Sequence, residues 1–208
     1  MIPLFAFPAD VGVSGVILAV TLAVSLADFF TGYGLRDRFI LNPFLIHHRR
    51  QFYRIFTSAL IHGDFFHLAV NMFTFYSFGP YLERTIGGTK MAYLYLIAIV
   101  ASTLTTVFKH RNNPQYNALG ASGAVSAVLI SFIIFYPTAM LGVMFVIPMP
   151  AWAFALLYIG FSWYMSKRGG DGIAHEAHLW GAVSGLAVTF VFYPELVIQT
   201  LTLRRFWG

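Results

Sequence analysis

The longest stretch of this sequence without a charged residue runs from Asn112 to Ser166, and it constrains the fold more than any other feature. It is far too long for one membrane-crossing helix, which needs about 20 largely apolar residues. Pro137 and the pair Pro148 and Pro150 divide it, because proline ends or kinks a helix. Hydrophobic residues make up 58% of the chain and charged residues 10%, whereas an ordinary globular chain has about 25% charged residues. We therefore expect an all-α polytopic membrane protein.

Charges and turn residues divide the rest of the chain into further apolar segments. The segment 34–63 is too charged to span a bilayer and too aromatic for a plain linker, so we expect an ordered loop lying at the interface. The sequence predicts a single six-helix membrane domain over residues 1–208. Its predicted spans cover about residues 12–32, 65–83, 90–108, 119–136, 149–166 and 174–193.

The balance of charges and the absence of cysteine exclude several classes of function. Thirteen Lys and Arg against eight Asp and Glu give a net charge of +5. With so few charges in all, this excess is typical of loops at a lipid surface, not of a nucleic-acid patch. The absence of cysteine excludes disulfides, thiolate zinc sites and cysteine nucleophiles. The segment 1–13 contains Asp10 and no positive charge, so we expect no cleaved signal peptide.

Four polar residues fall at one depth of the predicted bundle. His67 and Asn71 lie four apart in the second span, Ser122 starts the fourth and His178 lies near the start of the sixth. Even-numbered spans run in the same direction, so all four residues lie about 5–10 Å below one membrane face. Polar groups at membrane depth are costly and by default mark function or helix packing. Their common depth predicts one site.

Small residues allow the fourth and sixth spans to meet. His178, Gly181 and Gly185 are spaced three and four apart, and Gly123 follows Ser122 on the facing span. Such small-xxx-small faces let membrane helices approach closely. Close approach is what a serine–histidine hydrogen bond of about 2.6–3.2 Å requires.

The chemistry that this arrangement favours is nucleophilic catalysis by a dyad. His178 would remove the proton of Ser122, while His67, Asn71 and backbone N–H groups at the start of the fourth span would bind the oxyanion. Glu176, two residues from His178, would point off that helix face, so no carboxylate completes a triad. We expect no metal or cofactor.

Three motifs, in this order, resemble those of the rhomboid family of intramembrane serine proteases: His67-Leu-Ala-Val-Asn71, Gly120-Ala-Ser122-Gly123 and Ala177-His178-Leu-Trp-Gly181-Ala-Val-Ser-Gly185. Tyr53-Arg54 is similar to the aromatic–Arg pair of the family's first loop, with Tyr where Trp is usual. Glu83 resembles the acid that ends the second span. The resemblance covers about residues 53–190, and the three motifs together are specific, whereas one GxSG alone is weak.

The resemblance implies a six-helix core that hydrolyses peptide bonds in or beside the membrane segments of other proteins. Carried over by motif, Ser122 would be the nucleophile and His178 the base, with His67, Asn71 and the Ser122 backbone at the oxyanion. Gly120 and Ala121 would form the loop that admits substrate. Many members carry an aromatic residue four positions after the serine, stacked on the histidine. Here Ser126 holds that position, so the support of His178 must differ.

Two other histidines lie near these motifs. We interpret His62, beside Gly63, as a turn or interface residue, with a role in the site as the alternative. His175 precedes His178 by three residues and could face the same cavity, where a supporting contact is favoured over catalysis.

Other classes of membrane protein fit less well. His175-Glu176-Ala-His178 lacks the histidine spacing of a metalloprotease, and Asp28 is the only aspartate that could serve an aspartyl protease. A transporter would show broken helices in related halves. A proteolytically inactive relative that binds membrane clients would share the fold and stays the alternative.

The resemblance also implies partners and an orientation. The substrates would be single-span transmembrane proteins in the lipid bilayer, with no nucleic acid involved. The family's orientation places the N-terminus in the cytoplasm and the active site outward, and we expect the cell (inner) membrane as the location. The loops then outside carry more Lys and Arg than the loops inside, which is the reverse of the positive-inside rule.

Overall fold

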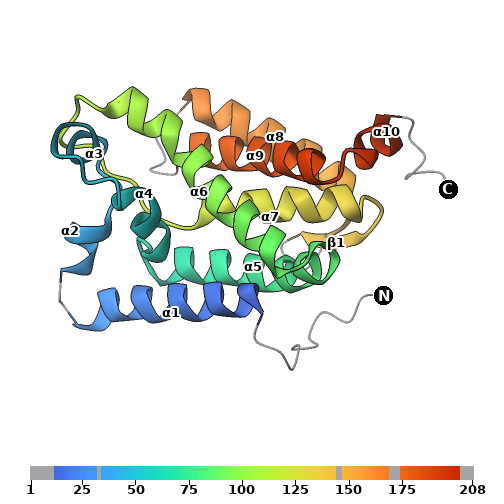
Figure 1. The fold of residues 1–208 in the computed structure, drawn as a ribbon, viewed down its shortest axis with the longest axis horizontal. Helices are drawn as coiled ribbons and strands as arrows, with labels where there is room; N and C mark the ends of the chain where they lie inside the picture. Colours follow the sequence, from blue (N-terminus) through green and yellow to red (C-terminus); the bar gives the residue numbers. More distant parts are fainter. Residues whose placement is uncertain (1–11, 32–33, 144–146, 169–173, 202–208) are drawn as a thin grey trace.

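The computed structural model describes residues 12–31, 34–143, 147–168 and 174–201, and these are mostly helical (Figure 1). The elements are α1 (Val13–Thr31), α2 (Leu35–Phe39), α3 (Pro43–Arg49), α4 (Arg54–Thr57), the 3₁₀ turn η1 (Ser58–Leu60), α5 (Phe65–Ile86), α6 (Gly88–His110), α7 (Ser122–Phe135), β1 (Met140–Val143), β2 (Ile147–Pro150), α8 (Ala151–Arg168), α9 (His175–Phe192) and α10 (Glu195–Leu201). Residues 1–11, on which the expectation about a signal peptide depends, lie outside the described part, as does residue 32 of the first predicted span.

Each predicted span coincides with one long helix, and the ends agree to within three residues. By length and composition, α1 and α6 can cross a membrane, and α7 is apolar but shorter. The helical bundle is therefore observed.

The helices depart from the predicted spans by up to three residues, at the end of α5, which continues to Ile86, and around α7. This helix begins at Ser122, three residues later than predicted, because Gly120 before it has a φ of 110°, which is not helical. After α7, β1 and β2 form an antiparallel hairpin in which Met140 pairs with Pro150, and we did not predict it. Pro137 follows the end of α7 and Pro150 precedes the start of α8, so neither helix extends into this segment. A short apolar run of this kind cannot be assigned to strand or helix from its pattern alone.

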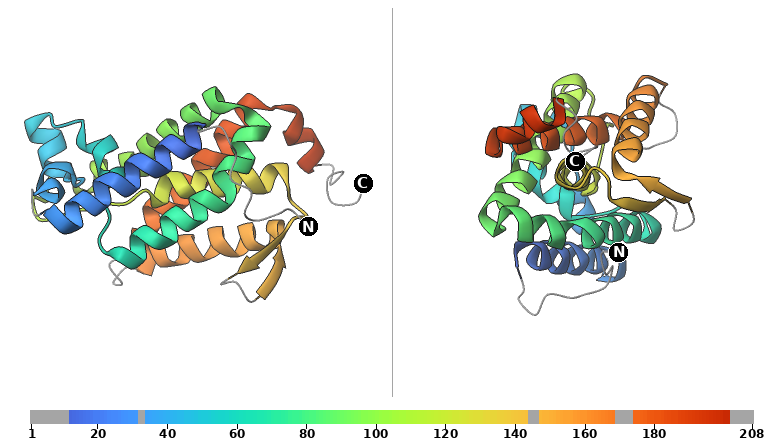
Figure 2. Two further views of the ribbon diagram at one scale, coloured as in Figure 1. Left: turned by 90° about the horizontal axis from the view of Figure 1, so that it is seen from below. Right: turned by 90° about the vertical axis from the view of Figure 1, so that its right-hand side faces the viewer.

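Helix α7 lies at the centre of the bundle, where the end-on view shows the other long helices around it (Figure 2). All but three of its 14 residues are buried. Helix α9 makes its most extensive contact, and α5 and α6 pack on it as well. The predicted nucleophile therefore starts the most enclosed helix of the fold.

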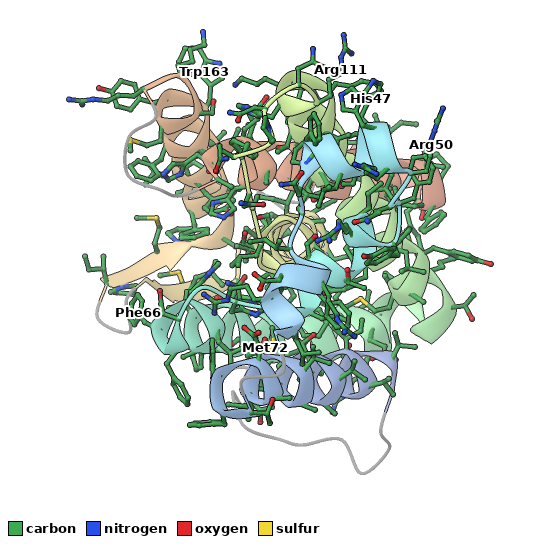
Figure 3. All side chains as sticks on the ribbon, turned by 90° about the vertical axis from the view of Figure 1, so that its left-hand side faces the viewer. His47, Arg50, Phe66, Met72, Arg111 and Trp163 are labelled. Carbon is green, nitrogen blue, oxygen red and sulfur yellow. The ribbon has the colours of Figure 1, made fainter. Side chains whose placement is uncertain are left out.

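The segment 34–63 is ordered, as expected. Arg54 is only 5% exposed, and its Nη1 donates to the carbonyl oxygens of Asp37 and Ile40, both at 2.9 Å, while Nε donates to Gln51 Oε1 at 2.6 Å. A buried cation is tolerated when hydrogen bonds replace its water. Arg54 thereby holds α2 and α4 together, and His47, Arg50 and Arg111 lie at this same end of the molecule (Figure 3).

Glu83, near the end of α5, binds the beginning of α1. Its two carboxylate oxygens accept hydrogen bonds from the N–H groups of Val13 at 2.7 Å and Ser14 at 2.8 Å. The first N–H groups of a helix have no partner within the helix and carry partial positive charge, so a carboxylate stabilises them. The acid that the sequence singles out thus joins two helices.

Candidate active site

The backbone that precedes Ser122 is held by two other segments. Ala118 pairs with Leu41 through two backbone hydrogen bonds of 2.9 and 3.0 Å, and Gly120 N–H donates to Ser58 O at 2.9 Å. Gly120 also lies against the ring of His67, since a Cβ built on it would stand 2.7 Å from His67 Cε1. With its φ of 110°, this position favours glycine for both space and conformation. The backbone that leads into Ser122 at the start of α7 is therefore held in place by these contacts.

Helices α7 and α9 cross at glycines beside the two proposed catalytic residues. A Cβ on Gly181 would overlap the carbonyl group of Gly123, and a Cβ on Gly185 would overlap that of Ala127. A Cβ on Gly123 would lie 3.3 Å from the carbonyl oxygen of Ala177, the neighbour of His178. Small residues therefore lie where the backbones of these two helices come into contact.

This crossing places Ser122 and His178 at its two sides, each next to a residue of the contact. Within the described residues, Ser122 Oγ forms no hydrogen bond. Catalytic hydrogen bonds are often long or poorly aligned without substrate and tighten in the complex. The serine–histidine bond therefore stays a prediction, supported by the backbone contact between their helices.

His67 and Asn71 share one face of α5, as expected from their spacing. Asp64 Oδ1 accepts a hydrogen bond from His67 N–H at 2.8 Å and so caps the helix. Asn71 is buried, and its Nδ2 donates to His67 O at 2.9 Å. The His67 ring reaches the loop before Ser122 through Gly120. The oxyanion role of both residues stays a prediction.

His175 lies close to His178, in the manner expected of a supporting residue. Its ring is buried, with its centroid 5.7 Å from that of His178 and 5.6 Å from that of Phe161, both in edge-on contact. Glu176 instead forms an ion pair with Lys109 at 3.0 Å. This ion pair with Lys109 agrees with the expectation that Glu176 does not orient His178.

Ser126, at the position where an aromatic residue was expected from the family resemblance, makes two hydrogen bonds. Its Oγ donates to Ser122 O at 2.6 Å and lies 2.5 Å from the hydroxyl of Tyr158 on α8. Because the carbonyl can only accept, the Tyr158 hydroxyl is the donor to Ser126. A tyrosine from another helix thus reaches the turn that follows the proposed nucleophile, and we found no signal for this contact in the sequence.

His62 is the residue whose position the sequence interpretation most underestimated. It is fully buried, and its ring lies edge-on to that of His67 with centroids 5.0 Å apart. A position beside Gly63 and Asp64 suggests a turn, and only the folded chain shows that three segments close around this ring.

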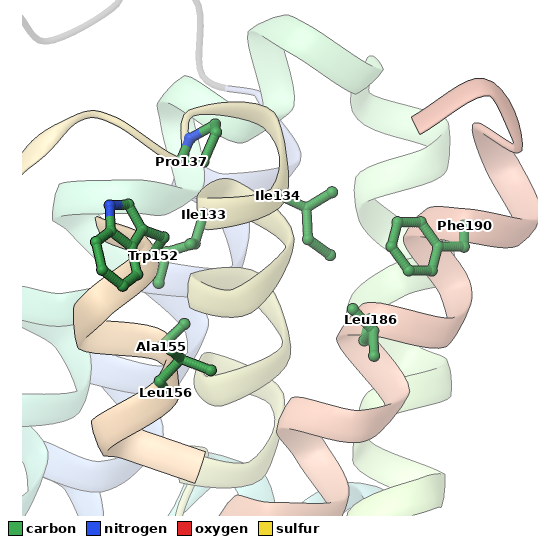
Figure 4. Close-up of a pocket in the computed structure, with 8 residues that line it drawn as sticks. All are labelled: Ile133, Ile134, Pro137, Trp152, Ala155, Leu156, Leu186 and Phe190. Carbon is green, nitrogen blue, oxygen red and sulfur yellow. The ribbon is translucent and has the colours of Figure 1, made fainter. Parts of the chain in front are cut away.

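An apolar pocket lies between the ends of α7, α8 and α9 that are remote from Ser122 (Figure 4). It is lined by Ile133, Ile134, Pro137, Trp152, Ala155, Leu156, Leu186 and Phe190. These side chains offer no group for acid–base or nucleophilic chemistry. This pocket is therefore not the candidate active site.

The bundle and its polar end define a class, that of helical integral membrane proteins with serine and histidine at a glycine-lined helix crossing. The Rhomboid domain model matches residues 49–195, and the chain belongs to the rhomboid family.

Curated relatives include both a named protease and a protein named inactive. The chain is 29% identical to RHOMBOID-like protein 12, mitochondrial, of Arabidopsis thaliana over 70% of this chain and 49% of the relative. It is 29% identical to Rhomboid protease GlpG of Haemophilus influenzae over 68% of this chain and 70% of that protein. It is 32% identical to Inactive rhomboid protein 1 of Drosophila melanogaster over 40% of this chain and 6% of that protein. The chain thus spans about half the length of the Arabidopsis relative.

Proposed function

We propose that this protein is an intramembrane serine endopeptidase that cleaves transmembrane segments of other proteins through Ser122 and His178. The observation that carries the proposal is the backbone contact of α7 and α9 at Gly123 and Gly181, beside these two residues. Membership in the rhomboid family and similarity to a relative named as a protease support it.

In the first step, a ring nitrogen of His178 takes the proton of Ser122 Oγ as the oxygen attacks the substrate's carbonyl carbon. The tetrahedral intermediate then collapses, the C–N bond breaks, and the histidine returns the proton to the leaving amine. An ester to Ser122 remains. Water, deprotonated by His178, attacks this ester, and the second product leaves with a new carboxyl group while Ser122 regains its proton.

The negative oxygen of both intermediates requires donors that are already in place. Ser122 is the first residue of α7, where N–H groups have no partner within the helix and the helix dipole is positive. In this proposal the Ser122 N–H, His67 and Asn71 bind the oxyanion. The start of α7 faces the loop end of the molecule, from which water can reach the ester (Figure 1).

The proposal includes six membrane spans, with a single-span protein as substrate. It places the site facing outward in the cell (inner) membrane, although relatives named as mitochondrial offer an organelle membrane as the competing location. Because the chain contains no cysteine, one cysteine introduced into segment 34–63 is a clean reporter. Labelling of intact cells by a membrane-impermeant maleimide supports the outward orientation, and labelling only after lysis contradicts it.

The decisive experiment incubates the purified protein in detergent or liposomes with a generic transmembrane substrate, beside Ser122→Ala and His178→Ala. We expect cleavage by the wild type and none by either variant, with melting temperatures close to that of the wild type. Full activity in either variant contradicts the assignment.

The second candidate is an inactive protein that binds membrane clients. The similarity to a relative named inactive favours it. It predicts that wild type and Ser122→Ala retain the transmembrane protein equally and cleave none of it.

A further inference from the structure

His62 lies where α1, the loop before α7 and the start of α5 come together. His62 is 0% exposed and lies in the short connection between η1 and α5. Ser25 Oγ of α1 lies 3.0 Å from its Nδ1, and Ala121 N–H donates to its Nε2 at 3.4 Å. On its other side, the ring of His67 makes edge-on contact. One imidazole thus touches the residue before the proposed nucleophile and a proposed oxyanion residue.

The directions of these hydrogen bonds determine the tautomer of His62. A backbone N–H can only donate, so Nε2 carries no proton when it accepts from Ala121. Ser25 Oγ donates its own proton to Leu60 O at 2.8 Å, so it accepts from Nδ1–H. The neutral ring protonated at Nδ1 is therefore the form that satisfies every partner.

The same short segment determines the path of the backbone into Ser122. Gly120 N–H is bound by Ser58 O at 2.9 Å and Ala121 N–H by His62. The two peptide groups that precede Ser122 are therefore oriented by residues 58–62. Ser122 N–H, which follows directly, is the backbone donor that the proposed mechanism uses.

We propose that His62 is a positioning residue for the nucleophile: its Nε2 acceptor holds the Ala121 peptide and thereby sets the direction of Ser122 N–H and the start of α7. This inference rests on the proposed function of Ser122. His62 touches no reacting atom and acts through Ala121.

The surroundings of His62 keep its ring in the neutral form. Burial and the neighbouring His67 lower the pKa of His62 to about 4, against a weaker opposing effect of Asp64. The guanidinium of Arg36 donates to the carbonyl oxygen of His62 at 2.9 Å and is itself paired with Asp28 of α1. Nε2 therefore stays available as an acceptor at the pH at which His178 would act as a base.

A purely structural role for His62 makes a different prediction from a positioning role. If the ring only fills space, activity follows stability in every variant. If the acceptor matters, activity follows the presence of an acceptor at the position of Nε2. A glutamine side chain carries an amide oxygen near that position, an asparagine reaches only as far as Nδ1, and a leucine fills space without an acceptor.

The experiment uses the full chain in detergent, as wild type and as Ser122→Ala, His62→Gln, His62→Asn and His62→Leu. For each we measure kcat and KM on a transmembrane substrate, the rate of labelling of Ser122 by a fluorophosphonate, and the melting temperature. We expect His62→Leu and His62→Asn to lower kcat and the labelling rate about 100-fold, the scale of a misplaced catalytic group, with KM little changed. His62→Gln should stay within about 10-fold of wild type.

Each other outcome overturns the inference in an identifiable way. Wild-type rates in His62→Leu or His62→Asn show that no acceptor is needed. Equal losses in the glutamine and asparagine variants, or losses that follow the melting temperature, show a structural role. If His62→Leu does not fold, the comparison of glutamine with asparagine still decides. If the wild type shows no faster labelling and no faster cleavage than Ser122→Ala, the proposed function itself is wrong. The proposed role of His62 is then wrong as well.

Discussion

Helices α7 and α8 follow one another in the chain and are held in the molecule in opposite ways. Nearly all of α7 is buried, and α9 crosses it at glycines whose Cα atoms lie against carbonyl groups. In α8 only Ala151 and Ser162 of 18 residues are buried, and large apolar side chains such as Leu156 and Phe161 are exposed. A short hydrogen bond from Tyr158 to Ser126 joins α8 to α7.

The difference shows what stabilises each helix in a membrane. Lipid is as apolar as leucine, so exposed apolar residues of α8 cost little there, and helices associate through close packing and polar contacts. Close packing fixes backbone atoms to each other, whereas one hydrogen bond restrains a helix far less. The proposed chemistry lies on the closely packed pair. Four predictions test this contrast.

The largest expected effect comes from a methyl group in the α7–α9 crossing. In Gly181→Ala the new Cβ would overlap the carbonyl of Gly123, and neither backbone can move aside without separating the helices. We expect a loss of about 3 kcal/mol in the free energy of unfolding and at least a roughly 100-fold loss of cleavage. Thermal or denaturant unfolding in detergent and a cleavage assay measure the two effects.

The matched control is Gly160→Ala in α8, where a Cβ meets no atom within 4 Å. There we expect an unchanged free energy of unfolding or a gain of up to about 1 kcal/mol from helix propensity. Equal effects of the two substitutions would remove the contrast between the helices.

The second prediction concerns the effect of low pH on His62, which joins α1 to the loop before α7. The pKa of His62 is about 4 in the folded protein against an ordinary value of 6.5, so between these pH values the unfolded chain binds more protons. The contribution of His62 to the free energy of unfolding is therefore largest above pH 6.5 and falls by roughly 2–3 kcal/mol as the pH drops to 4. Melting temperatures of wild type and His62→Gln across this range measure the difference, and parallel curves would contradict it.

The third prediction concerns α1, a peripheral helix whose first N–H groups are bound by a carboxylate of α5. Glu83→Gln keeps one acceptor for Val13 and Ser14 but removes the negative charge at the start of α1. We expect a loss of about 1–2 kcal/mol. Glu195→Gln, an exposed carboxylate in the first turn of α10, is the control and should change stability little. If both variants melt alike, the carboxylate at α1 contributes no more than a surface charge.

Much of the fold is predictable because apolar runs between charges and prolines locate the long helices directly. Gly181 and Gly185 also predict the close crossing, since their spacing places both on one helix face. The hairpin at β1 and β2 was missed, because a short apolar segment between prolines has no distinctive period.

The details around Ser122 are less predictable for a different reason. The surroundings of His62 and the bond between Ser126 and Tyr158 join residues far apart in the chain. A single sequence indicates which polar residues share a depth in the membrane, but not which pairs of side chains meet there. Motif spacing locates helices, whereas these contacts depend on how the helices rotate and pack.

The smallest expected effect is at the hydrogen bond between Tyr158 and Ser126, which joins the two helices compared above. Tyr158→Phe removes the hydroxyl that donates to Ser126 and keeps the ring packed between α7 and α8, while Ser126→Ala removes the acceptor. A double-mutant cycle of the two should give a coupling of about 0.5–1.5 kcal/mol in the free energy of unfolding, because hydrogen bonds between membrane helices are individually modest. Tyr164→Phe is the control, since the Tyr164 hydroxyl accepts from Arg168 within α8 and its loss should not couple to Ser126→Ala. A coupling near zero for Tyr158 would mean that this hydrogen bond does not help to hold α8 on α7, and the contrast with α7 would then be one of degree.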